Sequence, residues 1–441
     1  MDGVVIDSGL APAHCAELPN GVPQSDRPLK VAVLVDLTLS PDAGGHVKCW
    51  ERIAEAAVDF RDRLDLTVHF NGPAERRVEL SPSVRYVLMP PVFSTRRLVR
   101  QVPDHTDLGL WHRRLARELV NYDVIHTTDA FFCYARTATR FARRRGTPIV
   151  SSIHTNTPEY ARITVERLLG DVFGERIGPR LANGRLAIAS RVSRLLERRL
   201  YRHLDRVTMA MASYGGAVEA KFGGLHCGVA LRRGLDRALF SPAKRDRTWL
   251  EGRFGVSRDR FVVMYAGKLN AGKNAQALAP AVAAAAQGPA PLHLFCPGKG
   301  DEAARIAALL GDAATLPGVL AQDELARAYA SADLFLFPST IDESGNAAVE
   351  AMACGLPVLL AAGSGVASRM AACGGVRVLS GDDVAAWADA IATLAAEPQQ
   401  CRRLGALSRA FVEAHVPTWS EVVAEDLLPV WRSAAAVRGR P

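Results

Sequence analysis

Two lysines in the second half of the chain have the charge and the spacing to hold a diphosphate. Lys268 and Lys273 lie in residues 266–274, which read AGKLNAGKN, between an apolar run typical of a strand and one typical of a helix. Lysines placed where such a strand ends can neutralise the charge that develops on a pyrophosphate leaving group. A short loop of glycine and lysine is equally typical of a solvated surface turn, so this segment alone leaves both interpretations open.

A second segment, residues 337–357, joins acids to the start of a helix. It reads FPSTIDESGNAAVEAMACGLP, so an apolar strand passes through an acidic loop and Gly345 into a helix that begins at Asn346. The unpaired backbone N–H groups at the start of a helix attract anions such as a diphosphate. Asn346 and Glu350 are four residues apart and share one helix face, which places Glu350 one turn deeper, within reach of ribose hydroxyl groups.

Asp342, in the acidic loop, is the candidate for contacting whatever lies beyond the phosphates. The same acids also have a structural explanation, in which Asp342 caps the helix and Glu350 is a buried, hydrogen-bonded carboxylate. These two residues therefore need support from other motifs before they indicate chemistry.

The motifs need strands to position them, and the hydrophobic pattern predicts two sets. Short β-branched apolar runs alternate with longer amphipathic stretches, which is typical of βαβ units around a parallel sheet. In the first half, strands are expected over 31–37, 66–70, 85–88, 124–126, 148–153 and 206–211, and helices over 46–60, 107–120 and 131–145. In the second half, strands are expected over 261–266, 292–295, 333–337, 357–360 and 376–379, and helices over 274–286, 301–310, 322–330 and 346–353. Ligands of open α/β sheets bind beyond the carboxyl ends of the strands, where both candidate motifs fall.

The chain is long enough for two domains. At 441 residues it exceeds the size of one ordinary hydrophobic core. Glycine and proline in residues 234–242 mark a connection between the two series of elements. We expect a flexible leader over 1–28, a first domain over 29–240, a second over 241–417, and a C-terminal helix over 418–436 that completes the first domain.

The positive charge is confined to the first half. Residues 1–240 hold 35 Lys and Arg against 26 Asp and Glu, whereas residues 241–441 hold 19 against 20. Two arginine clusters stand out, at positions 136, 140, 143, 144 and 145 and at positions 191, 194, 198, 199 and 202. Such clusters suit an anionic lipid surface or an anionic substrate, although a solvated arginine-rich face has the same composition. They lack interleaved aromatic residues, so nucleic acid is not the expected partner.

Cysteine usage and hydropathy favour a cytoplasmic protein. The eight cysteines form neither a Cys-x-x-Cys motif nor a Cys/His cluster with zinc spacing, which favours a reducing compartment and no metal site. Residues 274–298 lack charged side chains, but four prolines interrupt them, so we expect no membrane-spanning helix. The arginine clusters favour peripheral attachment to the inner face of the cytoplasmic membrane.

Taken in order, the motifs resemble those of the retaining glycosyltransferases of family 4. The resemblance consists of Gly-Lys-Leu-x-x-Gly-Lys-Asn, then Phe-Pro-Ser, an acid, seven residues, Glu350 and Ala-Met-Ala-x-Gly-x-Pro. It extends upstream to Gly44-Gly45 after the first strand, to Ser152-Ile153-His154-Thr155, and to Arg233-Gly234-Leu235-Asp236. The resemblance spans roughly residues 30–360 and implies the GT-B fold, in which two Rossmann-like domains face each other across a cleft.

The resemblance also implies roles for individual residues in binding a nucleotide sugar. In the second domain, Lys268 and Lys273 would bind the diphosphate and Glu350 the ribose. Asp342 and the backbone of Gly345, Asn346 and Ala347 would face the donor sugar and the phosphates. Asp342 and Lys268 depart from the family, which usually has Glu and Arg at these two positions, and the shorter acid puts the donor-sugar preference in doubt.

In the first domain, the resemblance assigns a close approach to the phosphates and a contact with the sugar. Gly44 and Gly45 would let a loop come near the phosphates. His154 would lie beside the donor sugar and the acceptor, bonding a sugar hydroxyl group or the departing phosphate, although a lone histidine after a strand is often structural. His126, at a similar position, we interpret as structural.

The resulting hypothesis is a glycosyltransferase that moves a sugar from a nucleotide diphosphate donor, UDP before GDP, onto an unidentified acceptor. The arginine clusters favour an acceptor that is lipid-linked or otherwise anionic, and a soluble acceptor such as a cyclitol or a secondary metabolite stays open. The reaction would retain the anomeric configuration. Because no Asp-x-Asp motif is present and the lysines could supply the positive charge, we expect no metal or other cofactor. Two alternatives stay open from the residues: a nucleotide-sugar epimerase or hydrolase on the same fold, and a non-catalytic nucleotide-sugar-binding protein.

Overall fold

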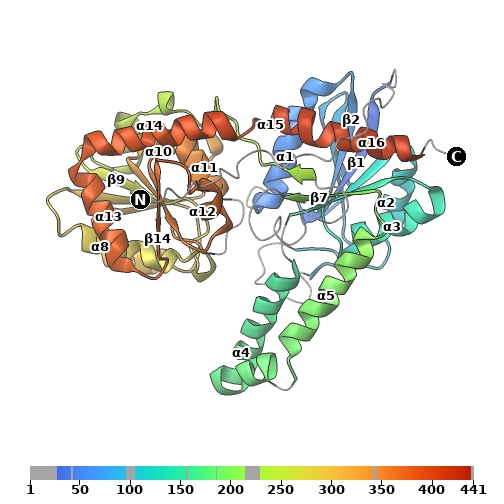
Figure 1. Ribbon diagram of the computed structural model, residues 1–441, viewed down its shortest axis with the longest axis horizontal. Coiled ribbons are helices and arrows are strands. Elements are labelled where there is room, and N and C mark those ends of the chain that lie inside the picture. The colour runs from blue at the N-terminus through green and yellow to red at the C-terminus, as the bar shows by residue number, and fades with distance from the viewer. Residues whose placement is uncertain are drawn as a thin grey trace, which may run out of the picture. The chain divides into compact units, whose positions relative to one another are not determined.

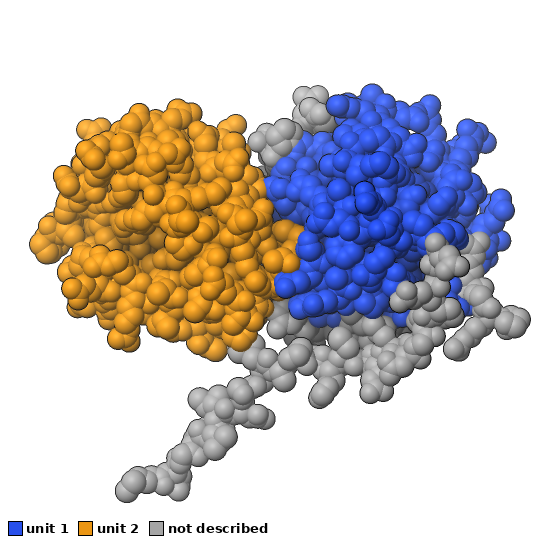
Figure 2. All heavy atoms as spheres, turned by 90° about the horizontal axis from the view of Figure 1, so that it is seen from above, with its two compact units in different colours: residues 1–214, 218–232, 420–441 blue, residues 215–217, 233–419 orange. Residues whose placement is uncertain are grey.

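The computed structural model describes residues 27–40, 43–95, 105–154, 157–184, 186–213, 229–340 and 345–438. These residues form two compact units, each with its own sheet covered by helices (Figure 1). Unit 1 contains the described residues up to 213, residues 229–232 and residues 420–438, and unit 2 contains residues 233–419 (Figure 2). The expected α/β architecture with two such sheets is confirmed.

The sheet of unit 1 has eight strands in the order β3-β4-β2-β1-β5-β6-β7-β8, and only β3 and β4 pair antiparallel. The strands are β1 Leu29–Thr38, β2 Leu64–Asn71, β3 Arg76–Ser81, β4 Val84–Met89, β5 Val124–Thr127, β6 Ile149–Ile153, β7 Met209–Ser213 and β8 Val229–Leu231. The apolar runs that predicted strands lie in its centre, where the Val31–Val35 stretch of β1 is buried on both faces.

Helices cover both faces of this sheet, and the last of them come from the C-terminus. They are α1 Gly45–Ala57, α2 Arg113–Glu118, α3 Cys133–Arg145, α4 Thr157–Asn183 and α5 Ile188–Leu204, followed after unit 2 by α15 Trp419–Glu421, a π-helical stretch Val422–Leu427 and α16 Leu428–Arg438. Helix α4 is broken at Gly174, where φ is 76°. Helices α4 and α5 pack along each other and extend away from the sheet (Figure 1).

The sheet of unit 2 has six strands in the order β11-β10-β9-β12-β13-β14, all parallel. The strands are β9 Phe261–Met264, β10 Leu292–Pro297, β11 Ala314–Gly318, β12 Leu334–Phe337, β13 Val358–Ala361 and β14 Val376–Leu379. The helices are α7 Arg247–Phe254, α8 Leu278–Ala285, α9 Ala303–Leu310, α10 Gln322–Ser331, α11 Asn346–Ala353, α12 Gly365–Met370, α13 Val384–Ala396 and α14 Pro398–His415. Both faces are buried: Phe335 and Phe337 pack into one hydrophobic cluster, and Leu334 and Leu336 into the other.

Some elements differ from the sequence prediction. The helix expected over 107–120 begins only at Arg113, because the Asp107 carboxylate accepts the backbone N–H groups of Val92, Phe93 and Gly109 and holds its own segment as a loop. Strands β3, β8 and β11 were not predicted, since short strands at the sheet edges carry little apolar pattern.

The two units divide the chain at slightly different residues from those that the sequence predicts. The sequence analysis placed the boundary after residue 240 and a completing helix over 418–436. The described residues divide after Arg232, and those from Ser420 onward pack in unit 1. Within the described ranges, no helix combines the length and the apolar character needed to cross a membrane.

Candidate functional site

The loop after β9 is anchored by hydrogen bonds at Lys268 and Leu269. The Tyr265 hydroxyl donates to the Lys268 carbonyl oxygen (2.8 Å), and Leu269 N donates to the Lys299 carbonyl oxygen (2.9 Å) in the loop after β10. The Lys268 side chain is half-buried. Lys299, which the sequence analysis did not select, is therefore a neighbour of this loop, and it follows a strand in a Gly-Lys-Gly run that could have marked it.

Two asparagine side chains anchor the loop on either side of the second lysine, Lys273. Residues Ala271–Lys273 form a short 3-10 helix. The side chain of Asn270 caps its start, because Asn270 Oδ1 accepts from Lys273 N (3.1 Å). Asn274 adopts a left-handed backbone with φ 53°, and its Nδ2 donates to Pro338 O (3.3 Å) and Gly381 O (3.1 Å). The lysine loop is thereby joined to the residue that follows β12. Because β9 and β12 are parallel neighbours, the two sequence motifs meet where the carboxyl ends of these strands lie side by side.

Helix α11 begins near these carboxyl ends, after a glycine that no other residue could replace without strain. Gly345 has φ 59°, and a Cβ atom there would lie 2.2 Å from Val366 Cγ2. The helix follows at Asn346, and Val349 N donates to Gly345 O (3.1 Å). The first backbone N–H groups of a helix have no carbonyl partner within it, so those of Asn346 and Ala347 suit an anion. Asp342 lies outside the described residues.

Glu350 lies one turn into α11, is half-buried, and is close to the Tyr329 hydroxyl and the Cys354 thiol. Burial, and then the nearby Glu350 carboxylate, hold the pKa of the Tyr329 hydroxyl well above its usual range. Burial first and Glu350 second also raise the pKa of the Cys354 thiol to about 12. Tyr329, on α10, was missed by the sequence analysis, because a tyrosine in an apolar helical stretch gives no sign of the acid it will face.

In unit 1, the glycine pair and the predicted histidine come together at the ends of β1 and β6. Gly44 precedes the first residue of α1, Gly45, and His154 directly follows β6. The His46 ring stacks on the His154 ring, with centroids 4.3 Å apart and an interplanar angle of 27°. Strand β5 separates β1 from β6 in the sheet, so the two rings meet only because α1 and the residue after β6 come together beyond the end of β5. His46 was also missed, although its position directly after Gly-Gly is a usable signal.

A chain of hydrogen bonds runs behind His154. The Ser152 Oγ atom lies 2.8 Å from His154 Nε2 and 2.8 Å from His126 Nε2, and Trp431 Nε1 donates to His126 Nδ1 (2.9 Å). The Trp50 ring packs edge-on against both imidazole rings. Burial, and then His46, lower the pKa of His126 to about 3, so this imidazole is neutral.

The buried carboxylate of Asp36, near the end of β1, connects three other segments of unit 1 by hydrogen bonds. Asp36 Oδ1 accepts from Asn71 Nδ2 (2.7 Å) and Asp107 N (2.9 Å), and Oδ2 accepts from Tyr134 N (2.9 Å). Burial, and then the charge of Asp129, raise the pKa of Asp36 to about 8. This group orders the start of α3 and the loop at Asp107.

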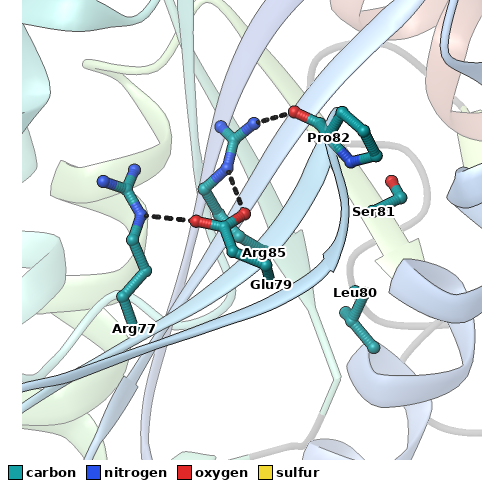
Figure 3. Close-up of a pocket in the computed structure, with 6 residues that line it drawn as sticks. All are labelled: Arg77, Glu79, Leu80, Ser81, Pro82 and Arg85. Atoms are coloured by element: carbon teal, nitrogen blue, oxygen red, sulfur yellow. Dashed lines mark hydrogen bonds and ion pairs between the residues drawn. The ribbon is translucent and has the colours of Figure 1, made fainter.

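One hollow on the surface of unit 1 contains none of the predicted residues. It is lined by Arg77, Glu79, Leu80, Ser81, Pro82 and Arg85 on the β3–β4 edge (Figure 3). Its cations are already paired: Arg77 lies 3.1 Å from Glu79, and Arg85 lies 3.3 Å from Glu79 and donates to Pro82 O (2.8 Å). Across the described ranges, no three His, Cys, Asp or Glu side chains are grouped to hold a metal ion.

Both halves of the chain match models of glycosyltransferase families. Residues 43–223 match the model described as Glycosyltransferase Family 4, and residues 260–397 match Glycosyl transferases group 1. The chain is 30% identical over 351 residues to D-inositol 3-phosphate glycosyltransferase 1 of Catenulispora acidiphila, covering 76% of this chain and 78% of that protein. It is 26% identical over 454 residues to D-inositol 3-phosphate glycosyltransferase of Mycolicibacterium vanbaalenii, covering 96% and 94%.

Solved structures of other proteins share the fold of this chain. Sucrose-phosphate synthase of Thermosynechococcus elongatus gives a TM-score of 0.65 at 20% identity, covering 93% of this chain and 100% of that chain. Anabaena HepE in complex with UDP-glucose gives 0.61 at 17% identity, covering 91% and 98%. At these identities the likeness is one of fold, and it agrees with the two-sheet GT-B architecture.

Proposed function

This chain belongs to the glycosyltransferases of group 1 and family 4, and we propose that it transfers a sugar from a nucleotide diphosphate to an anionic acceptor with retention of the anomeric configuration. The observation that carries the proposal is the bond from Asn274 Nδ2 to Pro338 O, which joins the lysine loop to the segment leading into α11. Two cations and a helix start then serve one diphosphate. UDP donors are the first choice, before GDP donors.

In the proposed reaction, the bond between the sugar C1 atom and the diphosphate oxygen breaks while an acceptor oxygen bonds to C1 on the same face. The acceptor proton passes to the departing phosphate oxygen. Lys268, Lys273 and the N–H groups at Asn346 compensate the charge left on the diphosphate. Glu350 accepts hydrogen bonds from the ribose. Since the lysines supply this positive charge, the proposal includes no metal ion.

The remaining predicted residues would contact the sugar end of the donor. Asp342 is proposed to face the donor sugar, and His154 to bond a sugar hydroxyl group or the departing phosphate. Gly44 and Gly45 have no side chains beyond hydrogen, which lets the start of α1 approach a phosphate closely. His46 next to them stacks on His154, which supports a common task for these residues.

The acceptor is proposed to carry negative charge. Two relatives are named for D-inositol 3-phosphate, which favours a phosphate-bearing acceptor. The two arginine clusters of unit 1 also lie next to each other. Arg199 of the second cluster is close enough to Arg136 of the first that, after burial, the charge of Arg136 and then that of Arg202 lower the pKa of Arg199. A basic surface built from α3 and α5 suits a soluble phosphorylated acceptor or the headgroups of an anionic membrane.

The decisive experiment is Lys273→Ala assayed with UDP-sugars and a panel of phosphorylated acceptors. Loss of a cation that stabilises the leaving group is expected to lower kcat by about a hundredfold or more. The matched control is Lys244→Ala, a lysine of the same unit paired with Asp323 (3.4 Å), which should keep the wild-type rate. Near-normal turnover by Lys273→Ala would remove the proposed role.

Incubation with the donor alone separates transfer from its alternatives. A glycosyltransferase is expected to leave most of the donor intact until an acceptor is added. Rapid release of free sugar, or conversion of the donor into an isomer, would instead indicate a hydrolase or an epimerase. Tight donor binding with no turnover on any acceptor would indicate a non-catalytic protein.

A further inference from the structure

We propose that Trp431, through His126 and Ser152, fixes the proton of His154 on Nδ1, so that His154 takes part in the transfer as a neutral hydrogen-bond donor. Trp431 lies on the C-terminal helix α16, 305 residues beyond His126 in sequence. This inference rests on the proposed function for the catalytic consequence, whereas the proton position itself can be measured without any reaction.

The direction of the hydrogen-bond chain follows from its first member. An indole N–H can only donate, so His126 Nδ1 must accept from Trp431 Nε1. A neutral imidazole has one protonated nitrogen, which places the hydrogen of His126 on Nε2. That N–H then donates to Ser152 Oγ at 2.8 Å.

The serine passes the direction on to His154. The Ser152 hydroxyl has two hydrogen-bonding neighbours in the described part of the chain, His126 and His154. Having accepted from His126, it uses its single hydrogen to donate to His154 Nε2 at 2.8 Å. The hydrogen of His154 therefore lies on Nδ1. With a hydrogen on Nε2 as well, His154 would meet the serine as a second donor and leave the buried hydroxyl hydrogen without an acceptor, which is costly.

Burial keeps this arrangement from being exchanged for hydrogen bonds to water. Trp431, His126 and Ser152 have no exposed surface, and His154 is 9% exposed. The rings are also held sideways: Trp50 packs edge-on against His126 and His154, and His46 stacks on His154. His46 and His126 are thus the titratable groups that face His154 from α1 and β5. Side chains locked in this way keep a catalytic group in one geometry.

The opposite face of the same strands provides a matched control. Successive residues of a strand point to opposite faces. Ser151 therefore lies behind the sheet, where its hydroxyl is 3.1 Å from Thr127 Oγ1 and 3.1 Å from His203 Nε2. Replacing Ser151 removes a buried serine hydroxyl from β6 with similar surroundings and no contact with His154.

The first test is the nitrogen chemical shifts of His154 in the 15N-histidine-labelled full chain, identified by comparison with His154→Gln. We expect the signature of a neutral ring protonated on Nδ1. A ring protonated on Nε2, or on both nitrogens, at neutral pH overturns the inference whether or not any transfer activity is found. Failure of the proposed function alone would leave the expected signature in place with no turnover.

The second test uses three substitutions and kinetics. Trp431→Phe and Ser152→Ala are expected to disturb the His154 signature and to lower kcat by about tenfold or more with a smaller change in KM, as for other residues that orient a histidine. Ser152→Thr, which keeps a hydroxyl group, should restore both. Ser151→Ala should leave both unchanged. Wild-type signature and rate in Ser152→Ala would overturn the inference even if Trp431→Phe failed to fold.

Discussion

Individual histidines of unit 1 show two ways of burying an imidazole. His126 is bonded at both nitrogens, to Trp431 and Ser152. His69, on β2 and separated from β5 by β1, is fully buried, and neither ring nitrogen has a hydrogen-bond partner in the described residues. Burial first, and then the charges of Arg77 and His112, lower the pKa of His69 to about 3. The imidazole of His69 therefore makes the stability of the fold depend on pH, with no hydrogen bond in the described residues to offset its burial.

Replacing His69 by leucine is expected to make the protein less sensitive to acid. The unfolded chain binds a proton on this ring below its ordinary pKa of 6.5, while the folded chain does not bind one until the pH approaches 3. Stability is therefore lost as the pH falls from 6.5 toward 3. At pH 5 the loss from one such histidine is about 2 kcal/mol, and His69→Leu should remove it. Urea unfolding at pH 7 and pH 5 measures the difference.

The control for this measurement is a substitution on the same strand that removes no titratable group. Thr67 is buried on β2, and its hydroxyl accepts from Arg85 Nη1 (3.2 Å). Thr67→Val should lower the free energy of unfolding by a similar amount at both pH values. An unchanged pH dependence in His69→Leu would show that this ring is not a source of the acid sensitivity.

Among the elements, the start of α11 has a strict steric requirement. Gly345 combines φ 59° with a Cβ position only 2.2 Å from Val366 Cγ2. Gly345→Ala is expected to lower stability by about 2–3 kcal/mol through backbone strain and overpacking. It should also weaken donor binding, because the first N–H groups of the helix move. Urea unfolding and calorimetric titration with a nucleotide diphosphate measure the two effects.

Two further variants separate strain from the steric clash. Gly255 ends α7 with φ 73°, and a Cβ atom there would have no neighbour within 4 Å. Gly255→Ala should therefore lower the free energy of unfolding by only about 1 kcal/mol, the strain of placing alanine in a left-handed backbone conformation. Adding Val366→Ala to Gly345→Ala should recover part of the lost stability. No recovery in the double variant would argue against the clash as the cause.

At the scale of the whole molecule, the charge is divided unequally between the two halves of the chain. The excess of Lys and Arg lies in residues 1–240, and α5 presents exposed Arg194 and Arg198 beside Leu195, which is 55% exposed. Arginines next to exposed apolar side chains suit the headgroup region of an anionic bilayer. This surface is the candidate for the membrane partner that we propose.

Sedimentation with phosphatidylglycerol vesicles tests that partner. We expect binding at about 50 mM salt and release at about 500 mM, because screening weakens contacts between exposed charges. Arg194→Glu combined with Arg198→Glu should abolish binding. The matched reversal of the exposed Arg402 and Arg403 of unit 2 should not. Absence of binding at low salt would favour the soluble phosphorylated acceptor.

The chain itself determined the local chemistry and the class of fold. Lys268 and Lys273 share one short loop, and Asn346 and Glu350 share one helix face, because residues so close in sequence are placed by a single turn or loop. The alternating apolar runs likewise indicated two α/β units, since strands and helices each impose their own period. The order of the motifs was sufficient to identify the family.

Tertiary packing decided which distant residues meet. No local pattern of residues indicated that His46 contacts His154, Asn274 contacts Gly381, or Tyr329 faces Glu350. His126 was interpreted as structural, and only the return of α16 to unit 1 shows that it connects Trp431 to Ser152 and His154. Such contacts depend on strand order and on side-chain packing across hundreds of residues, and a local pattern of residue types contains neither.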